Sequence, residues 1–411
     1  MTRQVLFFST ILTQERLSWI DQALKQYIHQ GKRAGPPVTP IPEVPGVTIF
    51  LTGDALYSLN DAESRDIWAS LLSVPAIRLV CNSDALDHRG ISLDPLEERF
   101  PEQISALPVE GHKSTPSFWD KVILSTRDSD PPGTRQQVGW LLLSSPYMFP
   151  SAGDAVQCLS AALGRDCGVS LYGYLDGCHA GHTGQITGDR ENTGTALERL
   201  AKQAAEKHLP CSLMVHRYSA AARGYQSWDD GMGTLGSSFT IRPAHIRDTS
   251  VLISDLKNTQ VLLSENAGCI IGNFQTRPEP DSGDAGQVTV LITHSPYSTE
   301  HTYGGIAFAV ACAHQGIRCR VIFLEDGIYA LTGEHRVPEN GENITPPELI
   351  AHLSGTANLK FFTLAPSFHM RGAIKNGTLE TIKEIGFEEL GTLLFPTGND
   401  TGSGNARILF F

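Results

Sequence analysis

The sequence has 411 residues, 41% of them hydrophobic, and a formal net charge of -12. This length exceeds what one hydrophobic core usually holds, so we expect two to four domains, and the acidic balance without any run of Lys or Arg argues against binding to a nucleic-acid backbone. No apolar run approaches the roughly 20 residues of a membrane helix, and eight scattered cysteines without a CxxC pair or a signal peptide indicate a cytoplasmic protein with reduced thiols.

One pattern of predicted elements occurs three times along the chain. It consists of an apolar strand, a polar loop, an amphipathic helix, a second strand that ends near an Asp and a Gly, another helix, and a third strand that leads to an Arg-Gly pair. Stretches rich in Pro, Gly and Asp separate the copies, so we expect domains at residues 1–130, 135–270 and 286–411. Strands that alternate with helices predict an α/β fold in which each domain is a doubly wound, mainly parallel sheet.

The apolar runs place the strands of each copy. In the first copy we expect strands at residues 5–9 and 47–51, a third strand that leads to Cys81, and a final strand at 121–125. In the second copy strands are expected at residues 138–144, 169–175, 212–215 and 251–254. In the third copy they are expected at residues 288–293, 319–324, 359–364 and 407–411. Functional side chains should lie at the carboxyl ends of these strands.

Cys81 stands between the third strand of the first copy and a helix that Asn82, Ser83 or Asp84 can cap. The N–H groups and the dipole of a helix N-terminus favour a thiolate over a thiol, so a cysteine there can act as a nucleophile or carry sulfur as a persulfide. The alternative is that Cys81 is a small buried hydrophobic residue, which is the usual state of a free cysteine.

Cys178 lies after the second strand of the second copy, beside His179 and His182. This trio contains metal-ligand side chains, but a fourth ligand is missing, so we favour a surface loop and expect no metal. Cys178 is also a candidate for a second sulfur station. Because no G-x-G-x-x-G fingerprint follows a strand, we expect no nucleotide or flavin cofactor.

The chain resembles three fused members of the DsrE/TusD-like sulfur-relay family, which includes the DsrF/TusC and DsrH/TusB relatives. The resemblance rests on Ser-Pro-Tyr at residues 145–147 and 295–297, and on Phe-Leu-Glu-Asp-Gly-Ile-Tyr at residues 323–329. It also rests on the Arg-Gly pairs at residues 89–90, 223–224 and 371–372. The second copy resembles TusD/DsrE, the third resembles TusC/DsrF, and the first is the most divergent.

The resemblance implies tandem flavodoxin-like domains and a persulfide carried on a cysteine shortly before the Arg-Gly pair. Only Cys81 matches, and it lies nine residues before Gly90, one more than the family spacing. The second and third copies have no thiol at the corresponding place, so they look like non-carrying copies kept for assembly or docking. For binding or support around the sites we expect Asp54, His88, Arg89, Tyr147, Asp176, His216, Arg223, Tyr297, Asp326 and Arg371.

We therefore expect an intracellular sulfur-relay protein, a persulfide sulfurtransferase in which Cys81 accepts sulfane sulfur and passes it to an acceptor thiolate. By resemblance the donor is a rhodanese or a TusA-like protein and the acceptor is a DsrC/TusE-like protein. A homodimer is expected, without membrane association. The alternative is a non-catalytic DsrE-like scaffold that docks sulfur-pathway enzymes.

Overall fold

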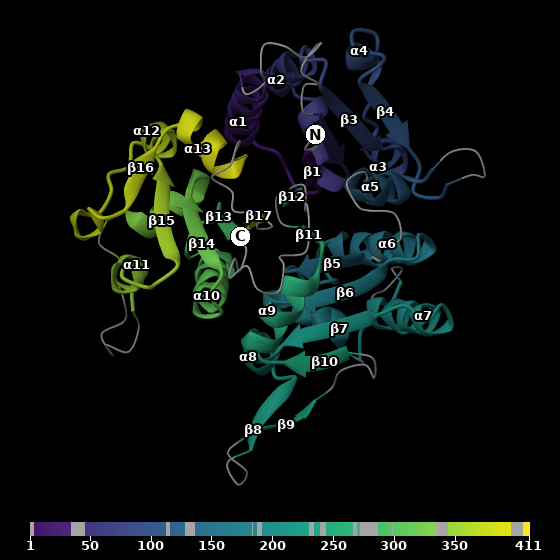
Figure 1. The fold of residues 1–411 in the computed structure, drawn as a ribbon, viewed down its shortest axis with the longest axis vertical. Coiled ribbons are helices and arrows are strands. Elements are labelled where there is room, and N and C mark those ends of the chain that lie inside the picture. Colours follow the sequence, from purple (N-terminus) through teal and green to yellow (C-terminus); the bar gives the residue numbers. More distant parts are fainter. Residues whose placement is uncertain are drawn as a thin grey trace.

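The elements of the chain form three groups, seen as three lobes in Figure 1. This computed structural model describes residues 4–33, 46–111, 116–127, 136–182, 184–186, 191–229, 234–238, 244–265, 269–271, 287–297, 299–333, 335, 344–395 and 406–411. We call the groups the first unit (4–127), the second unit (136–265) and the third unit (287–411). No helix in these described ranges has both the length and the apolar character needed to cross a membrane.

The first unit alternates strands with helices as the sequence predicts. Its strands are β1 (Gln4–Phe8), β2 (Val47–Leu51), β3 (Ile77–Asn82) and β4 (Ile104–Leu107). Its helices are α1 (Gln14–Arg33), η1 (Gly53–Leu59), α2 (Ala62–Leu72), α3 (Ser83–Arg89), α4 (Asp94–Glu97) and α5 (Phe118–Arg127). The strand expected at 121–125 is wrong, because these residues belong to α5. The helix buries Phe118, Trp119, Val122 and Ile123 on one face, which is a helical spacing.

The second unit repeats this order and adds a hairpin. Its strands are β5 (Gln137–Leu142), β6 (Gly168–Gly173), β7 (Cys211–His216), β8 (Gln226–Asp229), β9 (Thr234–Ser238), β10 (Ala244–Arg247) and β11 (Val261–Ser264). Its helices are α6 (Ser151–Gly164), η2 (Leu175–Gly181), α7 (Thr193–Glu206), α8 (Arg217–Ala222) and α9 (Thr249–Asn258). The strand expected at 251–254 is also wrong, since it lies within α9.

The third unit follows the prediction most closely. After the short strand β12 (Cys269–Ile271), its strands are β13 (Gln287–Ile292), β14 (Arg318–Phe323), β15 (Leu359–Leu364), β16 (Lys383–Ile385) and β17 (Ala406–Phe410). Its helices are α10 (His301–His314), η3 (Glu325–Leu331), α11 (Pro346–Leu353), α12 (Ala365–Arg371), η4 (Gly377–Leu379) and α13 (Phe387–Leu394). Thr345 and Glu348 form a capping box at the start of α11.

Within the described residues, the strands form one ten-stranded sheet, one five-stranded sheet and the β8–β9 hairpin. The five-stranded sheet of the second unit has the order β10-β7-β6-β5-β11 and is parallel throughout. The third unit has the equivalent order, β16-β15-β14-β13-β17. In the first unit, β12 takes the place beside β1 that a fifth parallel strand has in the other two, and it pairs antiparallel with both β1 and β17. The first and third units therefore share one sheet.

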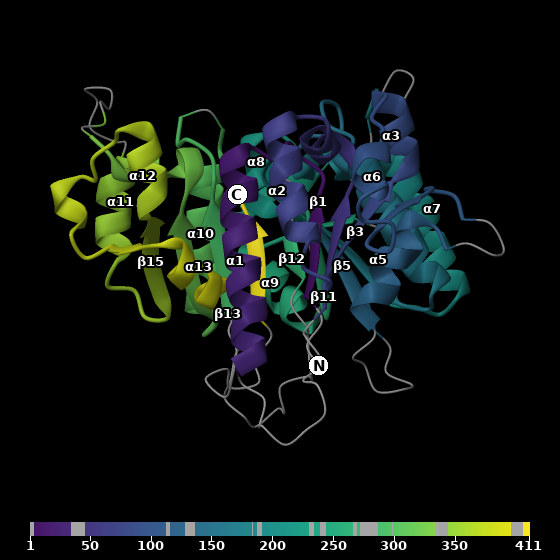
Figure 2. The same ribbon diagram turned by 90° about the horizontal axis from the view of Figure 1, so that it is seen from above.

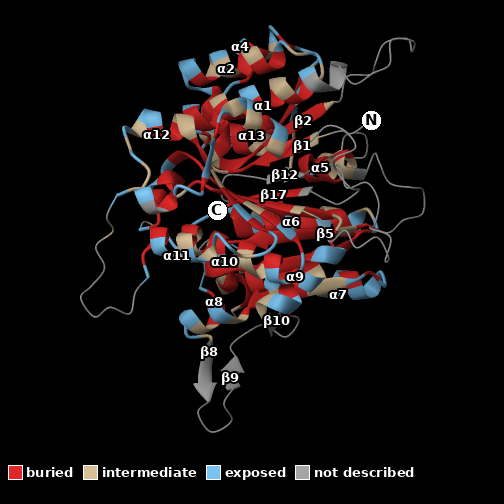
Figure 3. Ribbon diagram, turned by 60° about the vertical axis from the view of Figure 1, so that its left-hand side comes forward, coloured by how far each residue is buried: buried red, intermediate tan, exposed pale blue. Residues whose placement is uncertain are grey.

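Three hydrophobic clusters hold the molecule together, and each contains residues from more than one unit. One lies between the first and third units, one between the first and second, and one between the second and third. Figure 3 shows buried residues along both sheets and on the helix faces that cover them. The described residues thus form cores that are shared across unit boundaries.

At each boundary the last helix of one unit packs on the first long helix of the next unit. The last helix of the first unit, α5, packs on α6, and the last helix of the second unit, α9, packs on α10. The last helix of the third unit, α13, packs on α1 of the first, as Figure 2 shows. The three units therefore close into a ring with approximate threefold character.

Candidate functional site

The same junction occurs at the carboxyl end of the third strand in every unit. The N-cap residues of α3, α8 and α12 are Asn82, His216 and Leu364, and each lies eight residues before the Gly of the Arg-Gly pair. Asn82 accepts a hydrogen bond from the amide of Ala85 at 3.1 Å, and its own amide donates to Thr52 Oγ1 at 3.0 Å. None of the three junction positions carries a thiol.

Cys81 lies one residue before this junction, inside β3, and the expectation of an accessible thiolate at the loop is wrong. Its side chain is 0% exposed and belongs to the hydrophobic cluster between the first and third units. Burial, with a smaller effect from Glu97, raises the pKa of the Cys81 thiol far above its usual value. Because side chains alternate along a strand, a shift of one residue takes the sulfur from the junction into the core.

Cys178 is also closed off from solvent, at 1% exposure in η2. Its sulfur lies 3.7 Å from the carbonyl oxygen of Ser219, and burial raises the pKa of the thiol to about 12. His179 bonds Tyr225 instead, and His182 stacks on the Tyr225 ring. Within the described ranges no three His, Cys, Asp or Glu side chains form a group suited to a metal ion.

The predicted Asp and Arg side chains meet in each unit. Arg89 contacts Asp54 at 2.9 Å, Arg223 contacts Asp176 at 2.6 Å, and Arg371 contacts Asp326 at 2.9 Å. Each pair joins the start of η1, η2 or η3 to the end of α3, α8 or α12. The structure therefore brings the expected Asp and Arg residues together as three equivalent ion pairs.

Two of these arginines also bind an acidic residue at the first helix of the next unit. Arg223 contacts Glu300 at 2.7 Å, just before α10, and Arg371 contacts Glu15 of α1 at 2.7 Å. At the third boundary, burial raises the pKa of Asp154 in α6 to about 7, and the charge of Arg89 acts in the opposite direction. Ion pairs thus lie at two of the ring boundaries, and a buried carboxyl group lies at the third.

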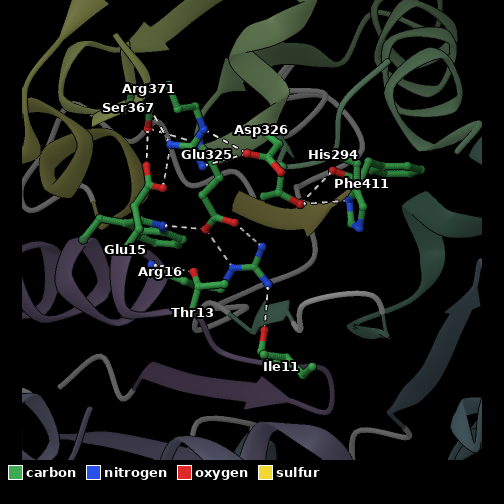
Figure 4. Close-up of polar contacts among 12 residues, drawn as sticks. Ile11, Thr13, Glu15, Arg16, His294, Glu325, Asp326, Ser367, Arg371 and Phe411 are labelled. Atoms are coloured by element: carbon green, nitrogen blue, oxygen red, sulfur yellow. Dashed lines mark hydrogen bonds and ion pairs between the residues drawn. The ribbon is translucent and has the colours of Figure 1, made fainter. Parts of the chain in front are cut away.

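Sequence reasoning missed a buried polar cluster between the first and third units, shown in Figure 4. Arg16 binds the carboxylate of Glu325 through Nε at 2.8 Å and through a second, shorter contact, and Trp19 Nε1 donates to the same carboxylate at 3.1 Å. Ser367 donates to Glu15 at 2.7 Å. These partners are more than 300 positions apart, so no local motif signalled their contact.

The backbone is left-handed at the same place in each unit, at the first residue of η1, η2 and η3. Gly53, Leu175 and Glu325 have φ values of 53°, 51° and 53°. A Cβ on Gly53 would lie 2.5 Å from the carbonyl oxygen of Ser9, which explains the glycine. In the other units a side chain occupies this strained conformation, and each one reaches toward the next unit. A Cβ on Gly304 would lie 2.8 Å from the Leu175 side chain, and Glu325 binds Arg16.

His216 is the only predicted supporting residue that lies at a junction position, and it is 5% exposed. Its Nδ1 accepts a hydrogen bond from the Ser219 amide and lies 2.8 Å from Ser219 Oγ, while Nε2 lies 2.8 Å from Thr249 Oγ1. Burial lowers the pKa of His216 to about 4, with Asp248 opposing the shift. The imidazole is therefore neutral at pH 7.

The remaining predicted residues lie near the surface. His88 is exposed at the end of α3. Tyr147 and Tyr297 are 40% and 64% exposed, and Tyr147 lies beside His179 while Tyr297 bonds His335. No chemistry beyond hydrogen bonding follows from these contacts.

Parallel sheets with polar side chains at their carboxyl edges define a mixed α/β protein built from related units. Residues 286–395 match the model of the DsrE/DsrF-like family, a range that contains the third unit up to α13. This match connects the third unit with sulfur relay in general. An uncharacterized protein of Methanocaldococcus jannaschii is 35% identical to this chain over 51 residues, which are 12% of this chain and 45% of that protein.

Proposed function

We propose that this chain takes part in sulfur relay as a non-carrying DsrE-like scaffold that docks sulfur-pathway proteins. The family match of the third unit supports the pathway. The observation that carries the non-carrying role is the residue at each junction: Asn82, His216 and Leu364 cap the helices where the resemblance places a carrier cysteine. The proposal replaces our expectation that Cys81 carries the persulfide.

The chemical requirements of sulfur transfer also support a non-carrying role. Persulfide exchange requires an accessible thiolate that attacks a donor sulfur. Cys81 and Cys178 are both buried, and burial raises the pKa of each thiol. Of the cysteines with described side chains, only Cys211 is not fully buried, and it begins β7, at the end of the strand away from the junction.

A loading experiment tests the absence of a carrier. We expect that folded protein incubated with glutathione persulfide shows no sulfur addition at Cys81 or Cys178 by peptide mass spectrometry, whereas protein loaded in guanidinium chloride does. The Cys81→Ala variant should be indistinguishable from wild type in the folded state. One added sulfur in the folded protein that Cys81→Ala or Cys178→Ala abolishes would contradict the proposal.

A binding experiment tests the docking role. By resemblance, the proposed partners are a TusA-like or rhodanese donor and a DsrC/TusE-like acceptor. Isothermal titration calorimetry should show saturable binding of at least one of these purified proteins, with the same affinity for wild type and Cys81→Ala. Absence of binding to all three classes would refute the scaffold.

A further inference from the structure

A cavity of about 860 Å³ opens between the second and third units, beside the junction that His216 caps. We call it the α10 groove, because α10 forms its floor and α8, the start of α9 and α11 form its sides. Its volume falls within the range of about 300 to 1,000 Å³ that small-molecule sites have. The groove is separate from the Cys81 region and from the cluster around Glu325.

The floor of the groove is unusually apolar for a helix that faces solvent. Helix α10 contains no Asp, Glu, Lys or Arg, and the side that faces the groove carries Tyr303, Ala307, Val310 and Ala311. Ala307 is exposed, while Ile306 and Phe308 belong to the core below. A helix that is apolar all round is normally covered on all sides, so this side favours an apolar occupant.

The charged groups of the groove already have partners inside the protein. Arg223 binds both Asp176 and Glu300, and these contacts are 2.6 and 2.7 Å long. His216 is neutral, because its Nδ1 accepts a hydrogen bond from the Ser219 amide and burial lowers its pKa. A charged ligand would enter an apolar space without a free counter-charge, which is unfavourable. The occupant should therefore be uncharged.

The hydrogen-bond direction at His216 identifies one polar contact for that occupant. Nδ1 accepts from the Ser219 amide, so in the neutral ring Nε2 carries the proton and donates to Thr249 Oγ1. The Thr249 hydroxyl is then left to donate its own proton, and Thr249 lines the groove. A carbonyl oxygen is the matching acceptor.

We propose that the α10 groove binds an uncharged, apolar small molecule whose carbonyl oxygen accepts a hydrogen bond from Thr249. The proposal rests on the lining, the paired charges and the orientation of His216. It does not depend on the docking role, and a ligand in the groove is compatible with either outcome of the sulfur-loading experiment.

Nile red is a suitable probe, because it is uncharged, apolar, carries a carbonyl group and changes its emission in an apolar site. We expect saturable binding with a blue-shifted emission and at least about tenfold weaker binding of the anionic dye anilinonaphthalene sulfonate. Ala307→Trp fills the groove and should weaken Nile red binding by about tenfold or more, whereas Ala62→Trp, at an exposed position of α2, should leave it unchanged.

The Thr249 contact is tested by a matched pair of variants. Thr249→Val removes the donor and should weaken binding by about fivefold to tenfold, while Thr249→Ser keeps the hydroxyl and should bind like wild type. Thermal unfolding of each variant establishes that it is folded. Equal binding by Ala307→Trp and Ala62→Trp, or binding of the anionic dye as tight as that of Nile red, would overturn the proposal.

Discussion

At the scale of single residues, Cys81 and Asn82 are neighbours at the end of β3 whose side chains have different surroundings: polar partners for Asn82 and a hydrophobic cluster for Cys81. Asn82 caps α3 and bonds across to Thr52, while the preceding side chain is sealed in the core. The same position in the second unit is held by a neutral histidine with two hydroxyl partners. Two of the three junctions thus have a capping side chain, and the third has Leu364, where a sulfur carrier needs a thiolate.

His216 should give the protein a measurable dependence of stability on pH. Its pKa is about 4 in the folded state, below the value of about 6.5 in an unfolded chain, so the unfolded state binds more protons between these values. His216 should therefore contribute a fall of up to about 3 kcal/mol in the free energy of unfolding as pH decreases from 6.5 to 4, while Asp154, whose pKa burial raises to about 7, contributes with the opposite sign.

Urea unfolding of wild type and His216→Gln across this pH range tests the prediction. The variant should be less stable at pH 7, and its difference from wild type should shrink toward pH 4. His301, whose pKa burial also lowers to about 4, contributes with the same sign, so the variant keeps part of the slope. His88→Gln, at an exposed position, is the control for loss of a histidine. A constant difference at all pH values would argue against this assignment.

The sequence singled out the Asp and Arg residues that pair in the structure, without predicting that they pair, and it did not predict the register of Cys81. Pairs such as Asp54 and Arg89 follow motifs that recur in order, and the recurrence locates them without knowledge of side-chain direction. Whether a residue is the last of a strand or the first cap of a helix depends on one position, and a one-residue change reverses its face. Arg16 and Glu325 meet only because the ring closes, so their contact has no local signal.

At the scale of elements, the left-handed first residues of η2 and η3 place their side chains against the next unit, whereas Gly53 of η1 approaches Ser9 of its own unit. Glu325 places its carboxylate against Arg16, and both side chains are less than 10% exposed. The Asp54 and Arg89 pair has a similar geometry at the surface, with Asp54 49% exposed. Buried and exposed ion pairs of this kind differ strongly in what the loss of one partner costs.

Glu325→Ala should lower the free energy of unfolding by about 3 to 5 kcal/mol, because it leaves the Arg16 guanidinium buried without a counter-charge. Glu325→Gly removes the same carboxylate but suits the positive φ, so it should be less destabilising by about 1 kcal/mol. Asp54→Ala should cost less than about 1 kcal/mol, since its carboxylate is half exposed. Equilibrium denaturation measures all three, and equal losses for Glu325→Ala and Asp54→Ala would be inconsistent with this account.

The two elements that sequence reasoning assigned wrongly are both last helices of their units. Short apolar runs such as residues 121–125 and 251–254 fit a buried strand and a helix face equally well. Tertiary contact decides between them: α5 packs on α6 and α9 packs on α10. In both cases the helix that covers the apolar face belongs to the next unit. The residues of the segment alone therefore do not show whether it forms a strand or a helix.

At the scale of the whole molecule, closure of the ring depends on close contact between α13 and α1. Gly391 lies where a Cβ would be 3.2 Å from the Cα of Ala23, so the helices approach closely at this point. Gly386, at the N-cap of the same helix, has open space around the equivalent position. Substitutions at Gly391 and Gly386 therefore test the contact between α13 and α1, one at the contact and one away from it.

Gly391→Val should destabilise the protein by about 1 to 3 kcal/mol, because the side chain separates the first and third units at their helix contact. Gly386→Ser, at a position that favours a capping side chain, should leave stability unchanged or raise it slightly. Thermal unfolding of the full chain measures both. If Gly391→Val unfolds like wild type, the α1–α13 contact does not contribute to closure.

The antiparallel strand β12 has a consequence for synthesis of the chain. Residues 269–271 complete the sheet beside β1, yet they leave the ribosome only after the entire second unit has been translated. At about 5 to 20 residues per second, this side of β1 stays unpaired for roughly 13 to 50 seconds. An unpaired strand edge can pair with the edge of another chain, so the first unit is most exposed to misassembly before residues 269–271 have been synthesised.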